Sequence, residues 1–289
     1  MSIENIRTIG VVGAGSMGAG IAQVAAQSGF QVNVVDVSDA VWTRAQKTIA
    51  KSLERMVNKE KITADQMKEA LDRIGFSADV GSLSGVPFLF EAVFEDVAVK
   101  KELYGKLDAV CGDEVVYATN TSSLSITELA SLVKRPGKFV GMHFFNPVPM
   151  MQLVEVIPAL QTDPSTTELA LSMAKRLGKT AITCKDTPGF VLNRLLIPYM
   201  IDAVRLLEAG VASAEDIDKA MKLGAGMPMG PFELMDFTGV EISYLVGEMF
   251  YKYTKEPRFA APGLLRNMVK AGYLGRKTGR GFYDYSEKK

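Results

Sequence analysis

Short apolar runs rich in β-branched residues recur along the first half of the chain and alternate with stretches of helical periodicity. Three of them, at residues 8–13, 31–36 and 88–91, read TIGVVG, QVNVVD and FLFE, and two more lie at 114–119 and 138–142. The run at 8–13 is short, β-branched and bounded by glycine, which predicts a buried parallel strand, and the other runs are expected to be strands as well. Strands that alternate with helices predict a doubly wound α/β domain.

The interval between the second and third expected strands is unusually long and helical in character. Residues 39–73 keep a helix-forming pattern that breaks near Lys61 and Ile62, and Thr63 is the expected cap of the second half. We therefore expect an inserted helical hairpin at this point of the α/β domain.

After Cys184 the sequence pattern changes from alternating strands and helices to helices alone. A long apolar-rich helical pattern covers residues 189–207, and the later helical segments are 214–221, 231–235, 241–253 and 262–271. We expect an all-α C-terminal domain, with residues 1–185 forming the first domain and residues 186–289 the second. The sequence KDTP marks the boundary, and Pro188 is expected to start the next helix.

Composition narrows the classes of protein that the chain can belong to. It has 289 residues with 33 basic and 33 acidic side chains, and this zero net charge argues against nucleic acid as the main partner. The chain has two cysteines without CxxC spacing and a single histidine, so we expect no metal site. The low cysteine content also fits a reducing, cytoplasmic location. The sequence contains no run of about 18 apolar residues, so we expect no membrane span. The N-terminus also lacks the pattern of a secretion signal.

A glycine pattern, GxGxxG, follows the first expected strand and opens a helix expected over residues 16–27. In that position the backbone N–H groups and the helix dipole can face a diphosphate, whereas the same pattern elsewhere indicates only a tight turn. This context predicts a Rossmann-like dinucleotide site. The residues expected to contact the cofactor are Gly13, Gly15, Ser16, Met17 and Gly18.

Asp36 ends the second expected strand, about 20 residues after the glycine pattern. A carboxylate there accepts hydrogen bonds from the ribose hydroxyls of NAD and repels the 2′-phosphate of NADP. Neither Val37 nor Ser38 offers a compensating cation, so the sequence favours NAD. The alternative is that Asp36 only caps the next helix.

Four basic residues on the expected hairpin, Arg44, Lys47, Lys51 and Arg55, are spaced three, four and four residues apart and so share one helical face. One interpretation is an ordinary solvated face. The other is a contact surface for the phosphates of the substrate.

The lone histidine, His143, follows the fifth expected strand, at the sheet edge where open α/β folds bind ligands. Residues 151–157 are expected to return as a strand that brings Glu155 beside it. A carboxylate bonded to one ring nitrogen fixes the tautomer and favours the imidazolium, which suits His143 for acid and base catalysis. The alternative is a histidine that only satisfies its hydrogen bonds within a core.

Further polar residues lie where the same crevice is expected. Residues 120–123, NTSS, follow the fourth expected strand, so Asn120 and Ser122 point toward the crevice or cap the helix that begins at Ile126. Asn193 lies within GFVLNRLL in the second domain and is expected either at the substrate cleft or in a bond to a neighbouring helix.

Several long stretches together resemble the L-3-hydroxyacyl-CoA dehydrogenase family, and within it the short bacterial 3-hydroxybutyryl-CoA dehydrogenases. The matching stretches are GVVGAGSMGAGIA, FEAVFEDVAVKKELYGKLD, ATNTSSLSI, GMHFFNPVPMMQLVEV, DTPGFVLNRLL and GRKTGRGFYDY, and they cover essentially the whole chain. The resemblance implies an NAD-dependent oxidoreductase that interconverts (S)-3-hydroxybutyryl-CoA and acetoacetyl-CoA. A dehydrogenase of a hydroxy acid without coenzyme A, and a non-catalytic NAD-binding protein, are the alternatives.

The resemblance also implies roles for individual residues. His143 becomes the catalytic acid and base, Glu155 its carboxylate partner, and Ser122 and Asn193 ligands of the substrate near its reacting oxygen. Glu95 and Lys100 are implied near the cofactor, where we also expect Asn120. The family further implies that Lys47, Lys51 and Arg55 meet coenzyme A and that the helical domain forms a homodimer, with no nucleic-acid or membrane partner.

Overall fold

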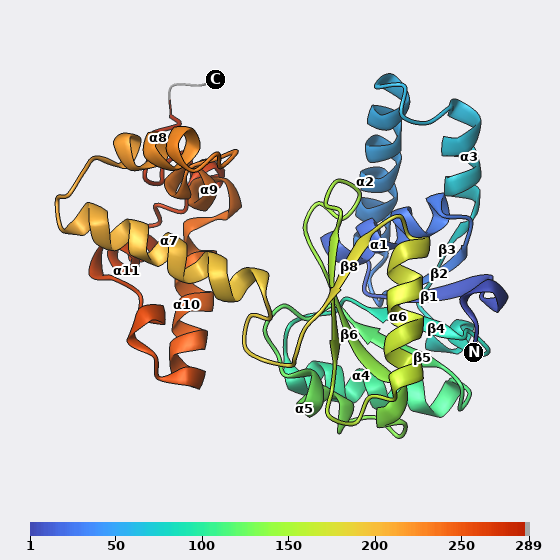
Figure 1. Ribbon diagram of the computed structural model, residues 1–289. Helices are drawn as coiled ribbons and strands as arrows, with labels where there is room; N and C mark the ends of the chain where they lie inside the picture. The colour runs from blue at the N-terminus through green and yellow to red at the C-terminus, as the bar shows by residue number, and fades with distance from the viewer. Residues whose placement is uncertain (287–289) are drawn as a thin grey trace. The chain divides into compact units, whose positions relative to one another are not determined.

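The computed structural model describes residues 1–286 and divides the chain into two compact units, residues 1–190 and a second unit that begins at Val191 (Figure 1). The first unit is built on one eight-stranded sheet in the order β3-β2-β1-β4-β5-β6-β7-β8. Neighbouring strands are parallel except β6 and β7, which pair antiparallel. The strands are β1 (Thr8–Val12), β2 (Gln31–Val35), β3 (Ile74–Ser77), β4 (Phe88–Glu91), β5 (Val116–Thr119), β6 (Phe139–Phe144), β7 (Leu153–Pro158) and β8 (Thr180–Thr183).

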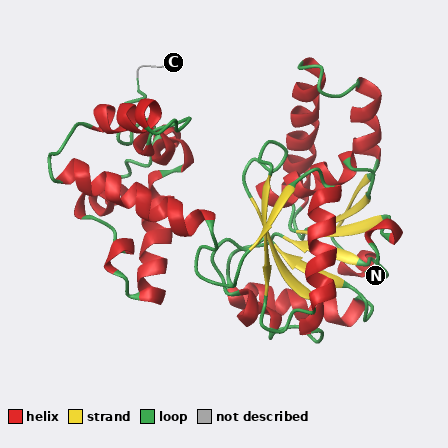
Figure 2. Ribbon diagram, in the orientation of Figure 1, coloured by secondary structure: helices red, strands yellow, loops and turns green. Residues whose placement is uncertain are grey.

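Helices cover both faces of this sheet (Figure 2). Alternate strand residues face opposite sides, so the sheet contributes to two separate cores. On one side Val11, Val34 and Phe90 pack with α1, α2 and α6, and on the other Val12, Leu89 and Tyr117 pack with α4 and α5. The helices of this unit are α1 (Ser16–Gln27), α2 (Asp39–Asn58), α3 (Ala64–Asp72), α4 (Val97–Val110), α5 (Ile126–Ala130) and α6 (Pro164–Arg176), with 3₁₀ turns η1 (Ile3–Asn5), η2 (Val80–Leu83) and η3 (Pro136–Lys138). The expected doubly wound α/β fold is confirmed.

The inserted hairpin is formed by α2 and α3, which extend beyond the edge of the sheet in Figure 1. The Thr63 hydroxyl accepts a hydrogen bond from the Gln66 backbone N–H at 3.1 Å, and the Gln66 side chain accepts one from the Thr63 N–H at 2.9 Å. This capping box satisfies two backbone donors and fixes the start of α3 where the sequence predicts it. The buried Ile49 and Leu53 hold α2 against the core that contains α1.

Three details of the predicted elements are wrong. Strand β3 was not expected, because residues 74–77 directly follow the hairpin and are only partly buried or exposed. Strand β6 continues to Phe144, so His143 lies within the strand instead of after it. Pro188 does not start a helix: residues 188–191 form a turn with Gly189 and Phe190 at φ 79° and 51°, and α7 begins at Leu192.

The second unit is all-α, as expected. Its helices are α7 (Leu192–Glu208), α8 (Ala214–Gly224), α9 (Pro231–Thr238), α10 (Val240–Thr254) and α11 (Gly263–Lys270), with 3₁₀ turns η4 (Pro257–Phe259) and η5 (Arg276–Thr278). The C-terminal stretch GRKTGRGFYDY is fastened to this bundle by two buried carboxylates. Asp236 accepts hydrogen bonds from the backbone N–H groups of Phe282 and Tyr283, both at 2.9 Å, and Asp218 accepts one from the Tyr283 hydroxyl at 2.6 Å. Among residues 1–286, no helix has the length and apolar character needed to cross a membrane.

Candidate active site

Each glycine of the loop between β1 and α1 meets a different spatial demand. Gly13 has φ 95°, and a Cβ on it would lie 2.5 Å from the Ala92 carbonyl oxygen. A Cβ on Gly18 would lie 1.8 Å from the carbonyl oxygen of Gly13, so only glycine lets the helix and the strand approach this closely. Around Gly15, by contrast, no heavy atom lies within 4 Å of the ideal Cβ position. The loop therefore has open space at Gly15.

The start of α1 faces that open space and fits an anion. Gly15 is the N-cap and supplies no side-chain cap, and no described residue accepts a hydrogen bond from the backbone N–H of Ser16 or Met17. Unsatisfied N–H groups at the positive end of a twelve-residue helix are what a diphosphate binds. The Ser16 hydroxyl donates to the Asn146 side-chain oxygen at 3.3 Å, which ties the loop to the segment after His143.

Asp36 lies at the end of β2 and does not cap the next helix. Its carboxylate accepts hydrogen bonds from the Ala14 N–H at 2.8 Å and from the Ser38 N–H at 3.1 Å, while Ser38 is the N-cap of α2. Asp36 thus braces the glycine loop from the neighbouring strand. Its partly exposed carboxylate also fits the ribose of a dinucleotide, and the adjacent Val37 is almost fully exposed.

His143 and Glu155 face each other across the antiparallel β6–β7 ladder. His143 Nδ1 lies 2.7 Å from Glu155 Oε2, and the two side chains are only 6% and 0% exposed. The rings of Phe145 and Phe190 pack on the imidazole with centroid distances of 4.4 and 5.6 Å. The structure therefore holds the imidazole by one nitrogen and leaves Nε2 for chemistry.

The polar residues after β5 hold the edge of the sheet and do not cap α5. Asn120 accepts a hydrogen bond from the Phe144 N–H at 2.8 Å, which joins the ends of β5 and β6. Ser122 donates its backbone N–H to Glu95 at 2.9 Å, and no described residue bonds its hydroxyl. The cap of α5 is Ser125, which accepts from the Glu128 N–H, so the capping alternative for residues 120–123 is wrong.

Lys100 lies near Glu95 but is buried. Its Nζ is 2.6 Å from Glu91 Oε1 and 3.6 Å from Glu95 Oε2, and the lysine side chain is 1% exposed. Glu95 itself is 35% exposed and accepts hydrogen bonds from residues 121–123. Of this pair, only Glu95 presents a side chain at the surface of the unit.

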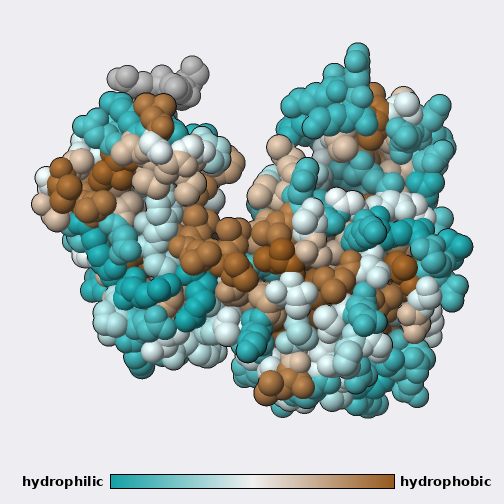
Figure 3. All heavy atoms as spheres, viewed as in Figure 1, coloured by the Kyte–Doolittle hydropathy of each residue, from teal (hydrophilic) through white to brown (hydrophobic). Residues whose placement is uncertain are grey.

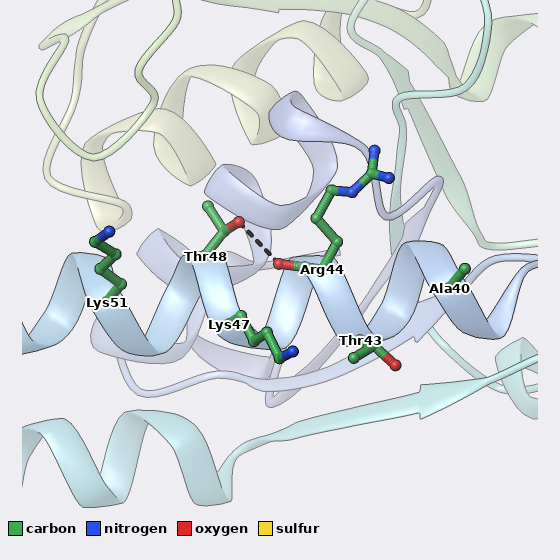
Figure 4. Close-up of a pocket in the computed structure, with 6 residues that line it drawn as sticks. All are labelled: Ala40, Thr43, Arg44, Lys47, Thr48 and Lys51. Carbon is green, nitrogen blue, oxygen red and sulfur yellow. Dashed lines mark hydrogen bonds between the residues drawn. The ribbon is translucent and has the colours of Figure 1, made fainter.

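The basic residues of α2 form a cationic surface on the hairpin (Figure 4). Arg44, Lys47 and Lys51 line a surface pocket of about 370 Å³ together with the polar side chains of Thr43 and Thr48. Arg55 is exposed one turn further along and does not line the pocket. None of the four cations forms an ion pair with a carboxylate in the part of the chain that the structure describes. Figure 3 shows the outer end of the hairpin as mostly hydrophilic.

Asn193 belongs to the second unit, where it is the second residue of α7 and partly exposed. The other predicted site residues all lie in the first unit. Among residues 1–286, no group of three or more histidine, cysteine, aspartate or glutamate side chains is arranged to hold a metal ion.

Three residues that shape this site were not expected from the sequence. Glu91 ends the apolar strand FLFE, and the same strand-end rule that selected Asn120 applies to it. Asn146, which bonds Ser16, precedes Pro147, and an Asn-Pro pair favours a turn without indicating this contact. Phe190 carried no sequence signal, because its contact with His143 depends on the turn that precedes α7.

The reactivity of the Cys184 thiol reports on the electrostatic surroundings of Glu155. Burial, followed by the negative charges of Glu155 and Asp186, raises the pKa of the Cys184 thiol to about 11. Since only the thiolate attacks alkylating agents, we expect Cys184 of the folded protein to react with iodoacetamide at pH 8 about 100-fold more slowly than in the denatured chain. A Cys111→Ser variant isolates this thiol, and equal rates in the two states would contradict the raised pKa.

The glycine loop after β1, the carboxylate of Asp36 and the buried His143–Glu155 pair lie along one edge of a doubly wound sheet. This is the arrangement of the NAD-dependent dehydrogenases. Comparison with known proteins gives the narrower assignment. A family model described as "3-hydroxyacyl-CoA dehydrogenase, NAD binding domain" matches residues 8–187, and one described as "3-hydroxyacyl-CoA dehydrogenase, C-terminal domain" matches residues 189–285. The chain belongs to the 3-hydroxyacyl-CoA dehydrogenase family, and it is an NAD-dependent oxidoreductase.

Individual relatives match over nearly their whole length. A 3-hydroxybutyryl-CoA dehydrogenase of Mycobacterium tuberculosis is 44% identical over 98% of this chain and 99% of its own. The mitochondrial hydroxyacyl-coenzyme A dehydrogenase of Rattus norvegicus is 44% identical over 97% of this chain and 91% of its own. The crystal structure of (S)-3-hydroxybutyryl-CoA dehydrogenase from Ralstonia eutropha superimposes with a TM-score of 0.95 at 46% identity, covering 98% of this chain and all of that one.

Proposed function

We propose that this chain interconverts (S)-3-hydroxybutyryl-CoA and acetoacetyl-CoA with NAD(H), and that His143 is the general acid and base. The observation that carries the proposal is the buried His143–Glu155 pair, with 2.7 Å between the imidazole and the carboxylate. The proposed substrate is supported by the M. tuberculosis and R. eutropha relatives, which are named as dehydrogenases of 3-hydroxybutyryl-CoA.

The cofactor is proposed to run along the carboxyl ends of the strands. Asp36 on β2 would hold the adenosine ribose, and the glycine loop after β1 would hold the diphosphate through the N–H groups of α1. The strand order then passes β4 and β5 before it reaches His143 on β6. Neighbouring strands are about 4.8 Å apart, so the path from β2 to β6 is about 19 Å long and suits an extended dinucleotide. Asn120 and Glu95 lie along it, with Lys100 beneath Glu95.

Bound NAD supplies the acceptor or donor of a hydride at the substrate carbon C3. His143 Nε2 would remove the proton from the 3-hydroxyl during oxidation and return it to the carbonyl oxygen during reduction. Glu155 fixes the tautomer through Nδ1 and stabilises the imidazolium once it forms. Phe145 and Phe190 restrict water around the ring.

Two further residues are proposed to position the substrate. The Ser122 hydroxyl has no partner among the described residues and would bond the reacting oxygen or its neighbour. Asn193, at the start of α7, would add an amide from the helical unit. Correct placement of the reacting groups is sensitive to about 1 Å, which is why both are assigned positioning roles.

Coenzyme A is proposed to meet the cationic surface of α2. Its phosphates would be held by Lys47, Lys51 and Arg55, since charge-assisted hydrogen bonds to phosphate are about twice as strong as neutral ones. The pocket at Arg44, Lys47 and Lys51 and the absence of ion pairs at these residues within the described chain support this role.

Reversing two of these charges tests the coenzyme A contact. For Lys51→Glu combined with Arg55→Glu we expect the KM for acetoacetyl-CoA to rise by about tenfold or more with kcat nearly unchanged, because ground-state and transition-state binding are lost alike. A matched control, Lys101→Glu with Lys252→Glu, makes the same change of charge at exposed lysines on α4 and α10. An unchanged KM in the α2 variant, or an equal rise in the control, would refute the contact.

A spectrophotometric assay of NADH consumption tests the function as a whole. Acetoacetyl-CoA is expected to support turnover with NADH, and longer 3-ketoacyl-CoAs and NADPH define the preferences. Free acetoacetate turning over as well as its CoA ester would favour the hydroxy-acid alternative, and no turnover with any ketone would favour a non-catalytic NAD-binding protein.

A homodimer in the cytoplasm completes the proposal. Leu195, Phe237 and Leu245 of the helical unit are each more than half exposed, and Figure 3 shows hydrophobic side chains on the surface of that unit. Exposed apolar surface of this kind supports self-association. The free thiols of Cys111 and Cys184 fit a reducing compartment.

A further inference from the structure

A buried carboxylate with a complete set of hydrogen-bond donors lies at the end of β4. Glu91 Oε1 accepts from Lys100 Nζ at 2.6 Å and from the Val93 N–H at 2.9 Å, and Oε2 accepts from the hydroxyls of Tyr104 at 2.8 Å and Thr119 at 2.7 Å. Burial, above all, raises the pKa of Tyr104 well above its usual value, so this phenol stays protonated and donates. Four donors around one fully buried carboxyl group are those of an ionised glutamate.

A second carboxylate shares the same ammonium group. Glu95 Oε2 lies 3.6 Å from Lys100 Nζ. Its other oxygen accepts from the Ser122 N–H at 2.9 Å, from the Ser123 N–H at 3.2 Å and hydroxyl at 2.9 Å, and from the Thr121 hydroxyl. Glu95 is therefore fixed at the carboxyl end of β5 and retains a partly exposed carboxylate.

These contacts leave an excess of negative charge. Glu91, Glu95 and Lys100 contribute two carboxylates and one ammonium group, so the triad carries one net negative charge. The positive end of α4 is close, but Asp96 caps it and accepts from the Ala98 and Val99 N–H groups at 2.8 and 3.0 Å. Asp96 therefore offsets the helix dipole and does not cancel the charge of the triad.

The triad and His143 share one face of the sheet. Tyr117, two residues before Thr119, and Phe139, four residues before His143, both belong to the core on the α4 and α5 side, and strand residues alternate faces. Glu91 pairs with Thr119, Thr119 with Gly141, and His143 lies two residues further on. Two strand spacings and two residues of rise separate Glu91 from His143 by about 12 Å.

We propose that the Glu91–Lys100–Glu95 triad makes this site discriminate between the two oxidation states of the cofactor, favouring the cationic nicotinamide ring of NAD⁺ over the neutral ring of NADH. The inference rests on the proposed cofactor path, in which the ring lies beside His143 and hence within electrostatic range of Glu95. A neutral ring gains little from the charge, whereas a cation gains through Coulomb attraction in a partly desolvated site.

The charge then favours ketone reduction. In that direction a hydride, one proton with two electrons, leaves the neutral dihydronicotinamide and forms the C–H bond at the substrate carbon, while His143 transfers a proton to the oxygen. The ring becomes a cation as its hydride departs. Negative charge beside the ring lowers the free energy of this product and of the transition state that leads to it.

Two substitutions at Glu95 separate charge from geometry. Glu95→Gln removes the charge and keeps a side-chain oxygen for the donors of residues 121–123. Glu95→Asp keeps the charge and withdraws the oxygen from those donors. The dissociation constants of NADH, by its fluorescence, and of NAD⁺, by calorimetry, are measured for both variants and for the unaltered chain.

For Glu95→Gln we expect NAD⁺ binding to weaken about three- to tenfold with NADH binding nearly unchanged, so the ratio of the two constants moves by that factor. For Glu95→Asp both constants are expected to change by a similar factor, which leaves the ratio in place. Glu102→Gln removes an exposed carboxylate further along α4 and is expected to leave the ratio in place as well.

An equal change of both constants in Glu95→Gln would overturn the inference and reduce Glu95 to a structural role, as would an equal ratio shift in Glu102→Gln. If the unaltered chain binds both cofactors and the ratio of their dissociation constants does not move in Glu95→Gln, this inference fails while the proposed cofactor path stands. If the unaltered chain bound neither cofactor, the proposed cofactor path itself would fail.

Discussion

Replacing His143 by alanine is expected to lower kcat for acetoacetyl-CoA reduction by about 10²- to 10⁴-fold, the usual contribution of a positioned general acid or base. The sequence contains one histidine, so no second imidazole can take over the proton transfer. Cofactor affinity is expected to stay within about twofold, because the glycine loop and Asp36 lie on other strands. Steady-state kinetics and NADH fluorescence titration on the same preparation measure both quantities.

Packing must be separated from chemistry in this test. Alanine removes the ring that Phe145 and Phe190 cover, so His143→Gln is the matched variant that retains more of the buried volume. Both variants are expected to lose kcat to a similar extent. Glu155→Gln keeps the imidazole but loses the carboxylate that orients it and is expected to cost less, about 10- to 10³-fold. Near-normal kcat in either His143 variant would remove this residue from the mechanism.

Gly15→Val is expected to weaken cofactor binding strongly while leaving the fold intact. No heavy atom lies within 4 Å of the Cβ position, and φ is −65°, so valine fits the protein itself. The added methyl groups would occupy the open space where the diphosphate is proposed to approach α1. Overpacking costs about 1–3 kcal/mol, so we expect the Kd for NADH to rise about 10- to 100-fold.

Two other glycine variants serve as comparisons for Gly15→Val. Gly18→Ala would place Cβ 1.8 Å from the Gly13 carbonyl oxygen, and we expect it to reduce stability by about 1–3 kcal/mol or more. Gly105→Ala, on the exposed side of α4, has open space around it and is expected to change neither cofactor affinity nor, except for a small gain in helix propensity, stability. Thermal denaturation and NADH titration distinguish the three. Unaltered NADH binding in Gly15→Val would show that the cofactor does not approach the loop there.

The parts of the fold that follow from local pattern were predictable, and those that depend on context were not. Strand β1 with helix α1, and the capping box at Thr63, follow from short-range rules, and the structure has them where expected. Strand β3 was missed because its four residues carry little apolar signal and form a strand only beside β2. The turn before α7 depends on Gly189 and Phe190 at positive φ, which pattern alone does not reveal.

The candidate site divides in the same way. His143 and Glu155 were expected together, because a strand that returns to the sheet edge must pair with its neighbour, and the ladder places them opposite each other. The role of Glu91 was not predicted, because a single acidic residue at the end of an apolar strand usually only marks where the strand ends. Its partners Lys100, Tyr104 and Thr119 come from α4 and β5 and meet it only in the folded chain.

The antiparallel pairing of β6 and β7 bears on how such an enzyme can diversify. His143 and Glu155 are matched by the ladder, whose register is set by the buried faces of the two strands. The segment 145–152 that joins the strands is a loop, and loops tolerate insertion and replacement far better than ladders do. Substitutions in the exposed part of that loop, such as at Met150, can therefore accumulate without separating the base from its carboxylate. The catalytic pair stays matched while the exposed loop positions are free to vary.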